Sequence, residues 1–252
     1  MAAAGEPKID ALGQFTLHPA LGMFGHAVNF TQANALMLVA GALVLALLYY
    51  GARPRALVPG RLQAAAEMAY DFVYGMCTEQ IGQEGKQFFP FVFTLFFFVL
   101  FGNLLGLLPF SFTYTSHIAV TGALAIFVVA LSTVVGLRFH GWHFFSYFVP
   151  QGAPWYLLWL IVPIEVISYL SRIVSLAIRL FANMMAGHVM LEVFATFTVM
   201  LAGLGVLGTL GAVGPLALNV LMMGFELLVA VLQAYVFAVL TCIYLHDAVH
   251  LH

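Results

Sequence analysis

Charged side chains are scarce in this sequence. Asp, Glu, Lys and Arg make up 7% of its 252 residues and hydrophobic residues 63%, whereas soluble domains are about 25% charged. The mean hydropathy is +1.05. This composition excludes an ordinary soluble domain and indicates a protein that lies in a lipid bilayer. No run of basic residues suits nucleic acid, so we expect no nucleic-acid partner.

Cysteines and catalytic motifs are also sparse. Cys77 and Cys242 lie far apart in the sequence and lack the spacing of a zinc site, although one disulfide between them stays possible. The sequence contains no HExxH motif, phosphate-binding loop or nucleophile motif. We therefore expect no metal, no cofactor and no catalytic activity in the chain alone.

Long apolar runs predict five membrane-embedded helices, since about 20 apolar residues cross the hydrocarbon core. Residues 29–51 form the first span, residues 87–139 a helical hairpin, and residues 154–248 a hairpin of two very long helices. We expect the chain to reverse between these two helices in the glycine-rich run GLGVLGTLGAVGP. Each long helix has nearly forty residues and would measure on the order of 55 Å. Because this exceeds a core of about 30 Å, we expect both helices to be strongly tilted.

Residues 61–82 differ from these spans because acidic residues alternate with large apolar ones. Glu67, Asp71 and Glu79 share this segment with Met68 and Phe72, which predicts an amphipathic helix lying at the membrane interface. The predicted fold is thus all-α and polytopic, a single membrane domain over residues 1–252.

Basic residues predict the orientation. Five of them fall on one side of the predicted spans, which the positive-inside rule assigns to the cytoplasm; they are Arg53, Arg55, Arg61, Lys86 and Arg138. The C-terminus is then cytoplasmic, and residues 1–28 form a tail outside, where only Lys8 disagrees. The first apolar run has no basic region before it, so we expect it to be retained. We expect the bacterial plasma (inner) membrane, with the mitochondrial inner membrane as the alternative.

Polar residues form one stripe on each long helix. On the first helix they recur every three or four residues, which places them on one face: Glu165, Ser168, Arg172, Ser175, Arg179 and Asn183. On the second helix Asn219, Glu226 and Gln233 recur every seven residues. An arginine at the bilayer centre costs roughly 2.5–3.5 kcal/mol, so ionisable residues there indicate an ion or proton pathway.

Structural alternatives for these residues stay open. Arg172 could extend its head group to the cytoplasmic boundary or pair with Glu165, and Arg179 could form a salt bridge with Glu226. His188 could be an ordinary packed histidine. Asn183 and Gln233 could simply hydrogen-bond between helices. The sequence assigns no role to Glu192, four residues after His188.

Several motifs resemble subunit a of the rotary F-type ATP synthase from about residue 29 onward. The signature RLFANMMAGH spans Arg179 to His188, and FELLVAVLQAYVFAVLTCIYL, Phe225 to Leu245, is similar to the last helix of that family. PIE at Pro163–Glu165 and NLLGLLP at Asn103–Pro109 fit as well. The resemblance implies a stator subunit that passes protons through two offset half-channels to and from a carboxylate of the rotor ring, which couples proton flow to ATP synthesis.

The resemblance also implies roles for individual residues. Arg179 falls on the essential arginine that faces the rotor carboxylate, with Asn183 and Gln233 beside it. His188 and Glu226 fall on a pair that serves the outer half-channel. Glu165 falls on the acidic position of the cytoplasmic half-channel, with Ser175 nearby. Asn219 completes the stripe on the second helix and is counted with these proton-translocating residues.

The chemistry of these side chains agrees with such roles. An opposite charge favours the ionised form of a carboxylate, and arginine stays protonated and so does not relay protons itself. His188 and Glu226 can titrate. The implied partners are the rotor ring of c subunits, the peripheral-stalk b subunits and, indirectly, the soluble catalytic sector.

Two other functions stay open from the sequence: a secondary ion transporter, which would show repeated halves around a midplane site, and a structural membrane anchor. The His–Glu pair favours protons over sodium as the transported ion.

Overall fold

The structure is a computed structural model that describes residues 19–21, 30–52, 60–108, 113–149 and 155–250. Over these ranges the chain forms six α-helices and three short 3₁₀ helices. The α-helices are α1 (Gln32–Ala52), α2 (Arg61–Ile81), α3 (Gly85–Gly106), α4 (Ile118–His140), α5 (Leu158–Ala202) and α6 (Val206–Val249). The 3₁₀ helices are η2 (Tyr114–Ser116), η3 (Gly141–Phe148) and η4 (Trp155–Leu157).

Hydrophobicity divides the helices as the sequence predicts. Of the residues described, five helices are long and apolar enough to cross a bilayer, and α2 is not one of them. The all-α polytopic prediction is confirmed, and the chain is a multi-pass membrane protein. Before α1 lies a short antiparallel pairing of β1 (Pro19–Leu21) with β2 (Phe30–Thr31), which the sequence did not predict. Most of the predicted tail, Lys8, Arg53 and Arg55 lie outside the described residues.

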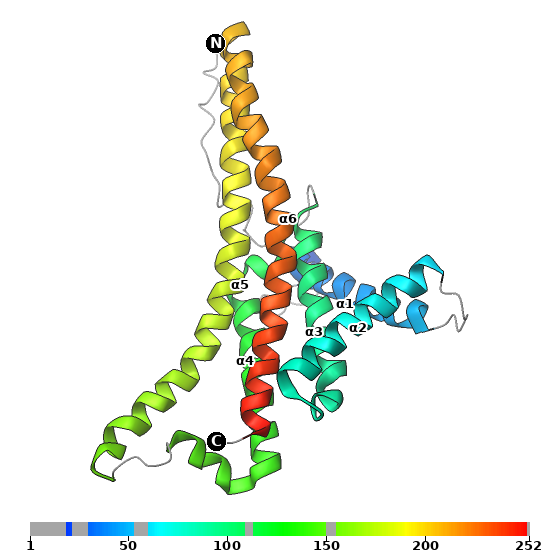
Figure 1. The fold of residues 1–252 in the computed structure, drawn as a ribbon. Coiled ribbons are helices and arrows are strands. Elements are labelled where there is room, and N and C mark those ends of the chain that lie inside the picture. Colours follow the sequence, from blue (N-terminus) through cyan, green and yellow to red (C-terminus); the bar gives the residue numbers. More distant parts are fainter. Residues whose placement is uncertain (1–18, 22–29, 53–59, 109–112, 150–154, 251–252) are drawn as a thin grey trace.

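The longest elements are α5 and α6, with 45 and 44 residues. At about 1.5 Å per residue each measures roughly 67 Å. They run antiparallel side by side along most of their length, and the first turns of α5 diverge from α6 (Figure 1). The predicted pair of very long helices is therefore present.

The reversal between α5 and α6 is shorter than the sequence suggested. We expected the chain to turn throughout the glycine-rich run that ends at Pro215. Instead α5 continues to Ala202 and α6 begins at Val206, and Gly205 supplies the positive φ of 85° that the turn needs. A glycine inside a helix costs only about 1 kcal/mol, whereas unpaired backbone groups in lipid cost several. Gly203 lies in the turn with Gly205, and the glycines of the run from Gly208 onward are therefore helical.

The central core lies where α3 and α4 pack against α5 and α6. Val92 and Val99 of α3, Leu180 of α5 and Phe237 of α6 are all nearly inaccessible to solvent. The helices α1 and α2 lie on the opposite side of α3 from the divergent start of α5 (Figure 1). Cys77 and Cys242, far apart in sequence, meet in this core with their sulfur atoms 3.9 Å apart, and both are free thiols.

Two glycines of α3 make room for Thr113 and Tyr114, which precede α4. Gly102 and Gly106 are four residues apart and so lie on one face of α3. A methyl group at Gly102 would overlap the phenol of Tyr114, and one at Gly106 would overlap Thr113. The Tyr114 hydroxyl donates a hydrogen bond of 2.9 Å to the Phe98 carbonyl. Burial raises the pKa of this phenol, so it remains a neutral donor.

This packing predicts that Gly102→Ala destabilises the protein by about 1–3 kcal/mol, because the added methyl displaces a fully buried tyrosine. Gly122→Ala is the matched control, since a methyl group on Gly122 of α4 meets open space. The measurement is the midpoint of heat unfolding of the detergent-solubilised protein. We expect a lower midpoint for Gly102→Ala alone; equal midpoints would contradict the close fit of Tyr114.

Candidate functional site

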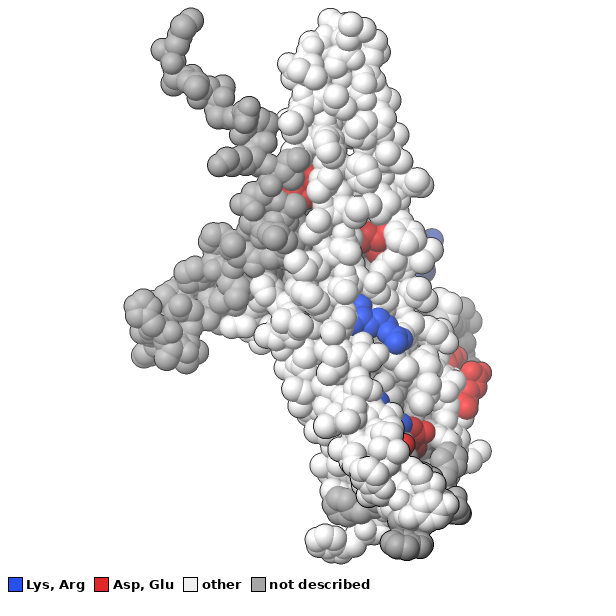
Figure 2. Space-filling model, turned by 90° about the vertical axis from the view of Figure 1, so that its left-hand side faces the viewer, with Lys and Arg blue, Asp and Glu red and all other residues white. Residues whose placement is uncertain are grey.

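Apart from Glu165, the charged residues and histidines of α5 and α6 fall into three groups along the hairpin. One group surrounds Arg172 where α6 ends, one is Arg179 by itself, and one surrounds His188 and Glu226 toward the reversal. Figure 2 shows the side of the molecule that carries α5, where a few charged side chains are separated by broad uncharged surface. The three groups are therefore separated from one another along the hairpin, and each has different neighbours.

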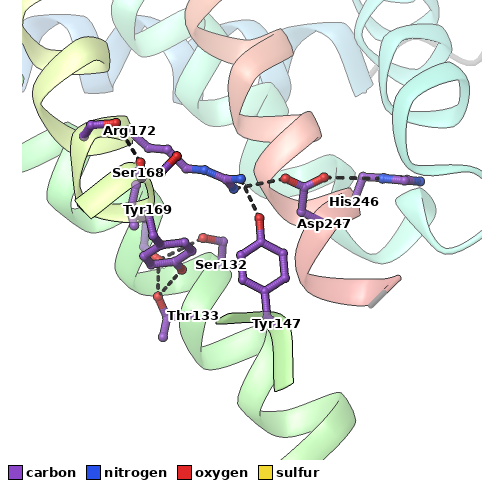
Figure 3. A network of polar contacts seen from close by, with 10 residues as sticks. Ser132, Thr133, Tyr147, Ser168, Tyr169, Arg172, His246 and Asp247 are labelled. Atoms are coloured by element: carbon purple, nitrogen blue, oxygen red, sulfur yellow. Dashed lines mark hydrogen bonds and ion pairs between the residues drawn. The ribbon is translucent and has the colours of Figure 1, made fainter. Parts of the chain in front are cut away.

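Arg172 is bound to α6 and to η3. Its Nη1 lies 3.0 Å from Oδ2 of Asp247, and its Nη2 donates a hydrogen bond of 2.6 Å to the hydroxyl of Tyr147. Figure 3 shows the side chain reaching from α5 toward both partners. The rings of Tyr147, Tyr169 and Tyr244 have their centroids 5.7, 5.4 and 5.1 Å from the guanidinium carbon, which is the range of cation–π attraction.

This cluster answers two questions that the sequence left open. The acidic partner of Arg172 is Asp247 rather than Glu165, and the guanidinium of Arg172 lies among aromatic rings while its side chain stays partly exposed. Burial raises the pKa of Tyr147, an effect that the charge of Arg172 opposes, so this phenol stays protonated. The hydroxyl of Tyr169 lies 2.7 Å from Oγ1 of Thr133 and thereby joins α4 to the cluster. The cluster fixes α5 to α6 where their ends diverge.

Arg179 has no such partner. It lies two helical turns after Arg172, its side chain is exposed, and it forms no hydrogen bond or ion pair with any other described residue. Leu176 and Leu180 beside it are buried and hold that part of α5 against the core. Ser175 and Asn183, one turn to either side, are exposed as well. The suggested salt bridge from Arg179 to Glu226 is wrong.

Glu226 is instead beside His188. Its carboxylate is 3% exposed, and its Oε1 lies 3.6 Å from Nε2 of His188. Neither carboxylate oxygen has a hydrogen-bond partner among the described residues. Gly187 makes the approach possible, because a methyl group there would come within 2.7 Å of Oε1. A buried carboxylate without a donor is costly, so this site is suited to exchanging a proton or holding water.

A third residue meets the same histidine. Oγ1 of Thr113, in the segment between α3 and α4, lies 2.6 Å from Nε2 of His188. His188 is thus not simply packed among apolar side chains. Sequence reasoning missed Thr113, Asp247 and Tyr147, since their roles depend on contacts between distant parts of the chain.

Comparison with known proteins bears directly on these residues. The family model described as ATP synthase A chain matches residues 34–246, which include Arg172, Arg179, His188 and Glu226 and end one residue before Asp247. The chain belongs to the ATP synthase A chain family. The resemblance inferred from the signature motifs is confirmed.

Curated members of the family match over nearly their whole length. The chain is 66% identical over 250 residues to ATP synthase subunit a of Granulibacter bethesdensis, covering 99% of this chain and 100% of that protein. It is 63% identical over 247 residues to ATP synthase subunit a of Gluconacetobacter diazotrophicus, with coverage of 98% and 99%. With ATP synthase subunit a of Acidiphilium cryptum the identity is 57% over 250 residues, with coverage of 99% and 100%.

The structure brings most of the residues suggested by the family resemblance into two pockets on the hairpin. Asn183, Glu226 and Gln233 line a pocket of about 320 Å³. His188, Glu192 and Asn219 line another of about 410 Å³. Glu226 contacts His188 and so connects the two sets. Glu165, which is half-buried, and Ser175 line neither pocket, and both lie on α5 before Arg179.

The Arg172 cluster generates a stability prediction. We expect Asp247→Asn to lower stability by about 1–3 kcal/mol, because the partly buried guanidinium loses its counterion. Arg172→Gln should cost a similar amount, and the double variant should cost less than the sum of the two. The measurement is the heat-inactivation midpoint of the detergent-solubilised complex. His246→Gln is the control, since His246 only approaches Asp247 at 3.8 Å; strictly additive effects would contradict the contact.

Proposed function

We propose that this chain is the proton-conducting stator subunit of an F-type ATP synthase, in which Arg179 separates two half-channels. The observation that carries the proposal is the arrangement along the hairpin. Arg179 is exposed and has no hydrogen-bond or ion-pair partner among the described residues, and it lies on α5 between His188, beside the buried Glu226, and Ser175 and Glu165. Family membership supports the assignment of the whole chain to this complex.

The outer half-channel would pass through the two pockets of the hairpin. His188, Glu192 and Asn219 give it a polar entrance. Glu226 takes the proton from His188, since the two side chains lie 3.6 Å apart and both can titrate. Asn183 and Gln233 line the pocket on the other side of Glu226 and extend a polar lining toward Arg179.

The cytoplasmic half-channel would run past Ser175 and Glu165. Ser175 is exposed one turn from Arg179, and Glu165 lies farther along α5 toward its start. The pair of Arg172 and Asp247 lies beside this route and holds α5 and α6 together there. Arg172 itself does not carry protons, because its guanidinium stays charged.

Arg179 provides the separation. Its positive charge favours the ionised form of a rotor carboxylate that comes to face it. The guanidinium does not give up its proton. A proton can therefore pass from one half-channel to the other only while it is bound to a rotor carboxylate. A potential of 100 mV then supplies about 2.3 kcal/mol for each proton, and this free energy is available to drive rotation.

The surroundings of Arg179 indicate where the rotor lies. Val174 and Ile178 on α5 and Leu228 on α6 are large apolar residues that remain exposed. An unpaired arginine facing lipid would cost roughly 2.5–3.5 kcal/mol, whereas a rotor carboxylate supplies its missing counterion. We therefore propose that this face binds the ring of c subunits, and that other faces bind the peripheral-stalk b subunits.

The remaining assignments follow from the same proposal. Residues 1–252 form one membrane domain in the bacterial plasma membrane, with residues 1–28 outside, residues 61–82 at the interface and the C-terminus in the cytoplasm. The transported ion is the proton, and the chain needs no catalytic site of its own. A purely structural anchor would not need the isolated charge of Arg179.

The decisive variant is Arg179→Ala. We expect ATP-driven acidification of inverted membrane vesicles to vanish while the subunit still assembles, because the exposed side chain forms no hydrogen bond or ion pair with another described residue. Arg138→Ala, which removes an exposed arginine at the end of α4, is the control and should pump at the normal rate. Pumping near the wild-type rate in Arg179→Ala would overturn the proposed function.

A further inference from the structure

Thr113 lies at the centre of a small hydrogen-bonded site on the outer half of the hairpin. Its Oγ1 is 2.6 Å from Nε2 of His188, and the same nitrogen is 3.6 Å from Oε1 of Glu226. Thr113 is 4% exposed, and Glu226 is also buried. One ring nitrogen of His188 therefore faces both a hydroxyl and a carboxylate in a site largely closed to solvent.

The position of Thr113 is fixed by its own surroundings. Gly106 of α3 leaves room for its side chain, since a methyl group there would overlap it. The hydroxyl of Ser116 and the backbone N–H of Ser116 donate hydrogen bonds of 2.5 and 3.1 Å to the Thr113 carbonyl. Tyr114, bound to the Phe98 carbonyl, fastens the next residue to α3. Thr113 is thus held by rigid elements rather than by a free loop.

A threonine hydroxyl is suited to a histidine that changes its charge. When His188 is neutral with its hydrogen on Nδ1, Nε2 accepts a hydrogen bond from the Thr113 hydroxyl. When His188 is protonated, Nε2 carries a hydrogen, and the Thr113 oxygen accepts it after a rotation of its own hydrogen. The heavy atoms need not move, so the ring keeps its orientation toward Glu226 in both states.

We propose that Thr113 is a positioning residue for proton transfer between His188 and Glu226. This inference rests on the proposed function and extends it to a residue on another element. In the transfer, His188 and Glu226 first close the 3.6 Å gap between Nε2 and Oε1. The hydrogen of Nε2 then leaves the Thr113 oxygen for the Glu226 carboxylate, which leaves a neutral imidazole and a neutral acid. Thr113 keeps its own proton throughout and turns from acceptor to donor as the transfer occurs.

The test compares Thr113→Val with Thr113→Ser in the assembled complex. Valine keeps the shape of threonine and removes the hydroxyl, whereas serine keeps the hydroxyl and removes a methyl group. At equal subunit content we expect ATP-driven proton pumping in inverted vesicles to fall about 2- to 10-fold in Thr113→Val. Thr113→Ser should stay close to wild type, and adding Thr113→Val to His188→Ala should cause no further loss.

Each other outcome overturns the inference. Wild-type pumping by Thr113→Val means that the hydroxyl is not used. Equal losses in the serine and valine variants, or an additional loss in the His188→Ala background, mean that Thr113 acts through packing alone. If the valine variant fails to assemble, Thr113→Ala replaces it under the same criteria.

Glu226→Gln, run in parallel, separates the two proposals. Loss of pumping in Glu226→Gln with normal pumping in Thr113→Val removes only the role of Thr113. Normal pumping in Glu226→Gln removes the outer half-channel itself.

Discussion

The positive charge of Arg179 is the feature on which our account of the hairpin depends. Its side chain is exposed and has no hydrogen-bond or ion-pair partner among the described residues. A permanent cation in a bilayer is costly, and a chain that needed only stability could pair it or replace it with leucine. This same chain does pair its other hairpin arginine, Arg172, with Asp247 and three tyrosine rings. The two arginines therefore differ in their surroundings, and this difference supports the proposal that the counterion of Arg179 comes from another subunit.

The two long helices supply the geometry that keeps this charge isolated. Arg172 and Asp247 tie α5 to α6 on one side of Arg179, and His188 meets Glu226 on the other side. Between these two contacts the buried Leu176 and Leu180 keep α5 against the core, so the exposed face stays outward. Side chains that can exchange protons thus lie on both sides of Arg179, which cannot release its own proton. Two separate proton routes require this arrangement.

Much of the fold could be predicted from the sequence, because hydropathy reports directly which segments enter lipid. The five apolar helices, the separate character of α2 and the two very long helices follow from it. The helical start of α6 was not predicted. A glycine-rich segment in water is usually a loop, whereas in lipid its backbone groups must be hydrogen-bonded to one another, which favours a helix. The contacts of Arg172 with Asp247 and of Thr113 with His188 also escaped prediction. They join residues 75 positions apart in each case, and no periodicity within one helix specifies which residues of another helix will meet it.

The central claim is that water reaches the two sides of Arg179 from opposite sides of the membrane. It is tested most directly by placing single cysteines at Asn219 and Ser175 in a Cys77→Ser and Cys242→Ser background, which removes both native thiols. A membrane-impermeant thiol reagent is then applied to sealed vesicles of each orientation. The account predicts that Asn219→Cys is labelled only from outside and Ser175→Cys only from the cytoplasmic side. Labelling of either position from both sides, or with the sides reversed, would contradict it.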